Sequence, residues 1–420
     1  MTNSDTRPRV ECFYSAFQGG ASLCTMFASF ALFLASPALA APNEANVPAQ
    51  RPAAAANAGF NDGIDRSDPN FVTASLLIMS PGDELYSCAG HACIRLECPT
   101  FNLDYCFSYE SESVKEKVLT FFMGKLKMGM FAIPTEDYLK LGRESGRGVM
   151  QYHLNLPPDV KQRLWKILDD KVAEGANLPY DHLKRGCAQT ILVLLREALK
   201  PRMLEVPPWP DFYKKTQREV VDYSISPRLY PWQRFFLTGI CGIEVDKNVP
   251  PSEKIMTPEV LLGFLRTVKV SGSPIIDNVG VELLPAKPLA SGPLVTPFAV
   301  SWFFVGLAVA DVFLHCRGID ILFLSIQSIG GLFYTFLVFA SNLPATSWHW
   351  LIVPFNLLPL LFWKWRWKWA LWFAVVLVLW ECGMVLYPHR LTDSAYLVLV
   401  VAYIGMYARI GWPQRLRQRT

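Results

Sequence analysis

A cysteine at the start of a helical pattern is the residue of this chain best suited to covalent chemistry. Cys187 follows a loop that Pro179 opens, and the apolar residues Ile191, Leu194 and Leu195 recur after it at helical spacing. In the first turn of a helix, unpaired N–H groups and the positive end of the dipole favour a thiolate over a thiol. Cys187 is therefore a candidate nucleophile, and the same N–H groups can hold an oxyanion. The alternative is a small buried residue that packs at a helix start.

A cysteine nucleophile needs a base, and histidine is the usual one because its pKa lies near ambient pH. Three histidines precede the apolar C-terminal part of the chain. His91 follows Gly90 at the mouth of an expected strand, and His153 lies within another, where it can be a surface residue. His182 is five residues before Cys187, across a loop whose geometry the sequence does not fix. His91 is the preferred base.

Residues near His91 supply a rival nucleophile and two orienting groups. Cys88 is a poor rival, because three residues across a tight turn seldom align a thiol with an imidazole. The side chain that orients the His91 ring is not set by the pattern. Asp104 and Ser108, on the strand that follows, are the two candidates.

The elements around these residues predict an α+β fold with an antiparallel sheet. Three strand patterns joined by short turns come first, which is typical of antiparallel pairing. The segment 201–251 is rich in Pro, Trp and Tyr without a clear period, so we expect an irregular segment on the sheet or near a lipid surface. The expected strands are 71–80, 87–96, 103–109 and 148–156, and the expected helices are 114–127, 158–174 and the one that Cys187 begins.

Composition separates the chain into two parts. Of its 420 residues 51% are hydrophobic, and the excess lies after about Val295, whereas residues 41–291 have the composition of a normal globular domain. The net charge of +4 is small and gives no reason to expect a nucleic-acid partner.

The N-terminus has the pattern of an export signal. Arg7 and Arg9 precede an apolar stretch, and Ala38 and Ala40 provide small residues for cleavage before Ala41. We expect a signal peptide at 1–40, with a retained anchor as the alternative. The Ala-, Asn- and Pro-rich residues 41–70 are expected to form a flexible linker to an exported domain at 71–291.

Export makes disulfides possible in that domain. Cys98 and Cys106 flank a Pro-Thr-Phe-Asn turn and are expected to staple a hairpin. The exported part has six cysteines, an even number, so parity singles out no free thiol. No cysteine pair has zinc spacing, and we expect neither a metal nor a cofactor.

The C-terminal part, 292–420, contains five apolar segments near the ~20 residues that cross a bilayer. With the domain outside, the basic residues fall in the cytoplasmic loops, as the positive-inside rule requires. Asp311 and Glu381 are carboxylates inside these segments; Asp311 is expected to reach the headgroups and Glu381 to pair with a neighbouring helix. The five expected membrane helices are 294–315, 318–340, 347–363, 369–387 and 394–412.

Three motifs resemble a known family. Ser-Pro-Gly-Asp-Glu-Leu-Tyr-Ser-Cys-Ala-Gly-His-Ala-Cys-Ile-Arg-Leu (80–96), Phe-Phe-Met-Gly-Lys-Leu (121–126) and Tyr-Asp-His-Leu-Lys-Arg-Gly-Cys-Ala (180–188) resemble the periplasmic domain of the Lnb-type lipoprotein N-acyltransferases. The resemblance covers about 71–199. It implies a circularly permuted papain-like (NlpC-type) domain in which histidine precedes cysteine, with His91 as the catalytic histidine and Cys187 as the nucleophile. Family members often have Asn before that cysteine; here Gly186 stands there, which leaves the Cys187 N–H as the better oxyanion donor.

The function that the resemblance implies is a cysteine acyltransferase in the bacterial inner membrane, with its catalytic domain in the periplasm. A membrane phospholipid would give an acyl chain to Cys187, and the N-terminal amine of a lipoprotein would accept it. Two alternatives remain. One is a papain-like amidase or peptidase that acts on the cell wall. The other is a non-catalytic envelope protein in which Cys187 forms a disulfide.

Overall fold

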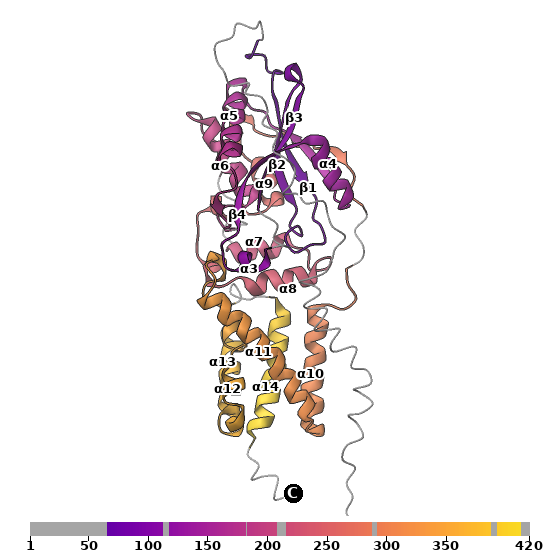
Figure 1. Ribbon diagram of the computed structural model, residues 1–420, viewed down its shortest axis with the longest axis vertical. Helices are drawn as coiled ribbons and strands as arrows, with labels where there is room; N and C mark the ends of the chain where they lie inside the picture. Colours follow the sequence, from indigo (N-terminus) through magenta and orange to yellow (C-terminus); the bar gives the residue numbers. More distant parts are fainter. Residues whose placement is uncertain are drawn as a thin grey trace, which may run out of the picture.

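The computed structural model describes residues 65–111, 117–181, 183–207, 216–287, 292–387 and 393–412. The expected signal peptide and residues 41–64 of the expected linker lie outside this range. The described chain forms two parts stacked along the long axis, an α+β domain and, below it, a bundle of apolar helices (Figure 1).

The centre of the domain is a seven-stranded sheet in which every neighbouring pair is antiparallel. Strand order is β6-β4-β3-β2-β1-β5-β9, so the first three strands form a meander in the middle of the sheet. The α+β class with an antiparallel sheet agrees with the sequence prediction. The strands are β1 (Thr73–Met79), β2 (His91–Cys98), β3 (Leu103–Ser111), β4 (Lys127–Pro134), β5 (Val149–His153), β6 (Leu178–Pro179) and β9 (Val281–Leu284), with a small separate hairpin of β7 (Lys269–Val270) and β8 (Ser273–Pro274).

One of these strands, β4, was not predicted, and the helix expected at 114–127 is shorter than predicted. Only α3 (Val118–Phe122) is helical in the segment 117–127, and β4 begins at Lys127. Met128, Met130 and Ala132 face one core cluster, and Phe131 and Ile133 face the other. This period of two places apolar side chains on both sheet faces, which a buried central strand can accommodate and a helix cannot.

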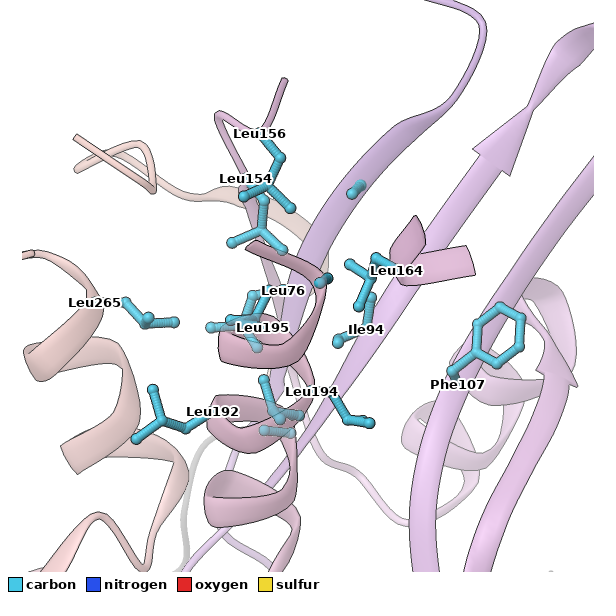
Figure 2. Packing of buried hydrophobic residues seen from close by; sticks show 14 of the residues in the cluster. Leu76, Ile94, Phe107, Leu154, Leu156, Leu164, Leu192, Leu194, Leu195 and Leu265 are labelled. Atoms are coloured by element: carbon cyan, nitrogen blue, oxygen red, sulfur yellow. The ribbon is translucent and has the colours of Figure 1, made fainter. Parts of the chain in front are cut away.

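Three helices cover one face of the sheet and one helix covers the other. α5 (Pro158–Glu174), α6 (Cys187–Leu199) and α9 (Pro258–Leu265) pack over the larger core cluster, while α4 (Thr135–Glu144) places Tyr138 in the cluster on the opposite face. Figure 2 shows leucines of α6 between Leu265 on α9 and Ile94 on β2. Burying each such leucine contributes about 1.5–3 kcal/mol, so α6 is firmly fixed against the sheet.

The segment expected to be irregular contains two further helices. α7 (Gln217–Ser224) begins with a capping box, in which the side chain of Thr216 accepts from the N–H of Glu219 and the Glu219 carboxylate accepts from the N–H of Thr216. α8 (Pro231–Ile240) begins with a proline at its first position. Both lie at the end of the domain next to the bundle (Figure 1), so the expectation of a segment near the lipid surface fits their position.

Four helices of the bundle are long and apolar enough to span a membrane. They are α10 (Pro297–Leu314), α11 (Arg317–Phe339), α13 (Arg366–Leu386) and α14 (Ser394–Gly411). Arg317 and Arg366 begin their helices at the end away from the domain, in agreement with the positive-inside rule when the domain is periplasmic (Figure 1).

The expected third membrane helix is not formed, so the prediction of five helices is wrong for the described residues. Its segment contains only α12 (Leu358–Leu361) and 3₁₀ turns, two of them Trp350–Ile352 and Trp363–Trp365. Because α11 ends at the domain and α13 begins at the far end, this segment returns through the bundle as an irregular chain. The hydropathy pattern predicted that this segment crosses the membrane, but it did not predict the irregular conformation. Two features explain that conformation: the prolines Pro354 and Pro359, and the tight packing of the segment's backbone on Gly331.

Side chains of the bundle bind carbonyl groups of the irregular segment. The Gln327 side chain on α11 donates to the carbonyl of Pro354 at 2.7 Å. A Cβ at Gly331 would lie 2.8 Å from the backbone carbon of Asn356, so the segment lies directly against α11. Non-helical backbone at membrane depth is stable only when protein surrounds it in this way.

Polar side chains join the domain to the bundle. Arg218 on α7 is buried, pairs with Asp246 at 2.7 Å, and donates to the carbonyls of Cys241 and Gly242. The same loop contacts the bundle, because the Gly242 N–H donates to the carbonyl of Ala345. These bonds hold the loop after α8 against the segment that follows α11.

The outer-end residues of the bundle belong to this junction. His349 is buried with its ring Nε2 2.7 Å from the carbonyl of Ile240, and the Asn342 N–H donates to the carbonyl of Met123. They hold the two parts of the molecule together.

At the other end of the bundle, Asp311 does not reach the headgroups as expected. It is fully buried and pairs with Arg409 of α14 at 2.7 Å. Glu381 was expected to pair with a neighbouring helix, but its Oε2 is buried with no hydrogen-bond partner among the described residues.

Candidate active site

Cys187 is the first residue of α6, as predicted, and the loop before it is held rigidly. The Asp181 side chain accepts from the N–H of Leu183 at 3.0 Å. Two buried glutamines, Gln189 and Gln217, both donate to the carbonyl of Leu183, at 2.6 and 3.1 Å. Because buried amides seldom give up such bonds, the helix start and its cysteine keep a defined position.

His91 is the first residue of β2 and is placed by the turn before it. Gly90 has φ +83°, and a Cβ there would lie 2.9 Å from the carbonyl oxygen of Met79. Only glycine fits this left-handed, tightly approached position. The turn therefore delivers His91 to the end of the sheet where α6 begins.

A chain of hydrogen bonds extends from the His91 ring into β3. Ring Nε2 lies 2.7 Å from Oγ of Ser108, and Ser108 donates to the carboxylate of Glu110 at 2.7 Å. Because the Ser108 proton goes to Glu110, its oxygen is free to accept from an Nε2–H. This arrangement leaves Nδ1 unprotonated in the neutral ring, which is the form a general base needs.

The thiol of Cys187 interacts with the side chain of His91. Burial alone would raise the pKa of Cys187, but the charge and hydrogen bond of His91 oppose it, together with the backbone N–H groups of Ala92 and Ala188. The net pKa of Cys187 is below the ordinary cysteine value. The structure thus brings together the two residues that the sequence singled out.

Other cysteines of the domain have the opposite character. Burial raises the pKa of Cys88 to about 12 and of Cys241 to about 11, and it also raises the pKa values of Cys93 and Cys98. Thiols of this kind are inert near neutral pH. Reactivity is therefore expected at Cys187 and not at these four sites.

The strand register and the side-chain contacts show which of the remaining candidates lie near His91. Ser108 contacts His91, whereas Asp104 is bound by Arg95 at 2.7 Å and accepts from Thr135 at 2.5 Å, so the suggestion that Asp104 orients the ring is wrong. His153 pairs with Ser75 on β1, four residues, or about 13 Å, from the Met79 position that pairs with His91. His182 lies outside the described residues.

The expected Cys98–Cys106 staple is absent, and both thiols are free. Cys98 points into the core cluster under α5 and α6, and Cys106 into the cluster with Tyr138 on the opposite face. The register explains this, because Cys98 pairs with Leu103 and Cys106 with Arg95. Counting residues across the turn did not reveal that the two side chains alternate to different faces.

Sequence reasoning missed Glu110 and Tyr180. Glu110 is two residues after Ser108, hence on the same face of β3, and burial raises its pKa while the Ser108 hydrogen bond and the charge of Arg147 oppose this. The hydroxyl of Tyr180 lies near the sulfur of Cys187, and burial together with the thiolate charge raises its pKa, so it stays protonated. The period-two spacing 108–110 was the available signal for Glu110.

Comparison with known proteins identifies this part of the molecule. Residues 60–219 match the family model described as Lnb N-terminal periplasmic domain. Over these residues the chain is similar to the Lnb family. The match includes both His91 and Cys187, and together with the four apolar helices it supports a membrane protein with a periplasmic domain. No curated protein and no solved structure matches the chain.

Proposed function

We propose that this protein is a membrane-bound cysteine acyltransferase of the inner membrane, which moves a fatty acyl chain from a membrane lipid to the N-terminal amine of a lipoprotein. The observation that carries the proposal is the hydrogen-bonded contact between Cys187 and His91, in an Lnb domain that is bonded directly to a membrane bundle. Both substrates of such a reaction are anchored in the membrane that the bundle is long enough to span.

In the first half-reaction, Nδ1 of His91 takes the proton of Cys187, and the thiolate attacks the ester carbonyl of the lipid. The developing oxyanion accepts from backbone N–H groups at the start of α6. The ester C–O bond then breaks, His91 returns the proton to the leaving alcohol, and an acyl thioester remains on Cys187. Ser108 and Glu110 hold the imidazole ring in place and stabilise its charge.

In the second half-reaction, the lipoprotein amine attacks the thioester. His91 takes a proton from the amine and gives it to the departing thiolate, so the amide forms as the C–S bond breaks. The sum is an ester and an amine converted to an amide and an alcohol, with no redox step and no cofactor. The site residues of the proposal are Cys187 as nucleophile and His91 as base and acid.

The experiment compares lipoproteins from a host that has no other N-acyltransferase and expresses either the wild type or Cys187→Ala. Mass spectrometry of the N-terminal lipopeptide is expected to find N-acylation only with the wild type. The matched control is Cys88→Ala, which removes a buried cysteine whose pKa is raised to about 12. This variant is expected to retain N-acylation. N-acylation that persists with Cys187→Ala contradicts the proposal.

A cell-wall amidase or peptidase would use the same pair of residues. Against it, hydrogen bonds and the Arg234–Asp393 ion pair hold the domain on the bundle, an arrangement that suits a substrate in the membrane more than one in the wall. Release of peptide fragments from purified wall by the wild type, but not by Cys187→Ala, would favour this alternative.

A further inference from the structure

A row of aromatic rings connects the membrane bundle to the candidate nucleophile. Phe333 on α11 contacts Phe122 on α3 with ring centroids 5.5 Å apart. Phe122 contacts Phe121 at 5.1 Å, and Phe121 contacts Tyr180 at 5.2 Å, each pair edge to face. We refer to these four rings, Phe333, Phe122, Phe121 and Tyr180, as the ring row.

The two ends of the ring row lie in different surroundings. Phe333 is six residues before the end of α11, so it lies about 9 Å into the bundle from the domain. At the other end, Tyr180 is close enough to Cys187 for the thiolate charge to act on its hydroxyl. The row therefore crosses the level at which lipid headgroups lie and ends beside the sulfur.

The ring row continues the lipid-facing surface of the bundle. Leu332 and Phe339 on α11 are 59% and 76% exposed, and Leu119 on α3 is 65% exposed. The rings themselves are half-buried, so part of each remains accessible. The ring contacts thus join the exposed apolar side chains of α11 to those of α3, which lies at the top of the bundle (Figure 1).

Basic residues flank this surface where it leaves the membrane. Lys125 and Lys127 follow α3 directly, and Lys117 precedes it, and all three are exposed. Lysines beside an apolar surface at the membrane boundary are suited to phosphates of lipid headgroups. The combination points to a lipid more than to an apolar segment of a protein.

We propose that the ring row is the track along which the acyl chain of a membrane glycerol ester reaches Cys187. The chain lies on Phe333, Phe122 and Phe121 as the lipid is partly withdrawn from the bilayer, and its ester carbonyl arrives at the sulfur. The rings keep the methylenes out of water, which would otherwise oppose every step of the withdrawal. This inference rests on the proposed acyl transfer and names where the donor binds.

The first test uses the full-length protein in vesicles and measures one turnover of Cys187 acylation. The donors are matched glycerol esters with a long acyl chain and with a butyryl chain. Phe122→Ala and Phe121→Ala are expected to slow long-chain acylation at least tenfold and to leave butyryl acylation within twofold of wild type. Phe122→Leu, which keeps an apolar side chain, is expected to retain most of the long-chain rate.

The matched control is Phe101→Ala. Phe101 is a partly exposed ring in edge-to-face contact with Phe71 at 6.0 Å, on the hairpin far from the bundle, and its loss is expected to change neither rate. Equal slowing of both donors, or no slowing of the long-chain donor, in Phe121→Ala and Phe122→Ala would overturn the inference. Absence of any acyl-enzyme in the wild type would instead contradict the proposed function.

The second test needs no chemistry at Cys187. Full-length Cys187→Ala is placed in vesicles of phosphatidylethanolamine and phosphatidylglycerol that contain a phospholipid with a photoreactive group in its acyl chain. A parallel sample contains a diacylated lipopeptide with the same group. Crosslinks at Val118–Phe122 and at Phe333 are expected, and the more efficient probe identifies the source of the acyl chain. Crosslinks confined to the outer faces of the bundle helices with both probes would overturn the inference, whatever the acylation assay gives.

Discussion

Two carboxylates, one in the domain and one in the bundle, are paired in different ways. Glu110 accepts from Ser108, which in turn contacts the ring of His91. Asp311 is fully buried and pairs with the guanidinium of Arg409. An imidazole can both accept and donate a proton, whereas a guanidinium in a protein stays charged. The first pairing is therefore suited to proton transfer, and the second to holding helices α10 and α14 together.

The largest expected effect is at the imidazole. We expect His91→Ala to lower Cys187 acylation about 10³-fold, because general base catalysis contributes about 10²–10⁴-fold. The pKa of Cys187 is below the ordinary value partly because of His91, so alkylation by iodoacetamide should persist to lower pH in the wild type and need higher pH in His91→Ala. If His91→Ala left the pH profile of alkylation unchanged, His91 would not be the group that lowers the pKa of Cys187.

The matching change in the bundle should affect stability and leave chemistry alone. Arg409→Ala leaves the buried Asp311 and the half-buried Asp320 without their cation, which is expected to cost about 3 kcal/mol in unfolding free energy. Thermal unfolding in detergent measures this. As a control, Arg202→Ala breaks an exposed pair with Asp159 and should cost under about 1 kcal/mol. A large loss of activity per folded molecule in Arg409→Ala would contradict a purely structural role for the Arg409–Asp311 pair.

A neutral hydrogen bond in the bundle should matter less than the ion pair. Gln327→Leu leaves the buried carbonyl of Pro354 without its donor, and we expect a loss of about 2 kcal/mol. Gln233→Leu is the control, since Gln233 makes the same kind of bond to the carbonyl of Asp83 in an exposed position. Equal stability of the two variants would mean that the irregular segment does not depend on Gln327.

The smallest expected effect is at the serine between His91 and Glu110. Ser108→Ala removes the acceptor of the ring Nε2–H, and we expect about a tenfold lower rate of Cys187 acylation, roughly the 1.4 kcal/mol of one hydrogen bond. Ser145→Ala, an exposed serine bonded to its own helix, should leave the rate unchanged. If both variants had wild-type rates, the chain from His91 to Glu110 would be structural only.

Local pattern was enough to place the nucleophile. Apolar spacing after Cys187 predicted α6, and the same reasoning gave α5 at 158–174 to the residue. The position of His91 at a strand mouth followed from Gly90, and Ser108 was one of two residues named on the next strand. These features are local, so a single sequence contains them.

What the sequence could not give depends on contacts between distant residues. Asp104 and Ser108 look alike in the pattern, and only the pairing of β2 with β3 sends Arg95 to Asp104 and His91 to Ser108. The third membrane crossing has the hydropathy of a helix, but Gln327 and Gly331 of α11 stabilise an irregular chain instead. The ring row joins residues from three segments of the chain, which no spacing rule connects.

The contact between the loop after α8 and the segment after α11 has a consequence for which substrates can be reached. The Gly242 N–H donates to the carbonyl of Ala345, and the ring Nε2 of His349 lies 2.7 Å from the carbonyl of Ile240, so the domain and its sulfur are held at a constant height above the bilayer. An enzyme on a long flexible tether can reach substrates at many distances from the membrane, whereas this one would reach only those just above the lipid. Molecules anchored in the same leaflet enter that layer whenever they diffuse past the enzyme, and soluble peptides enter it only by chance.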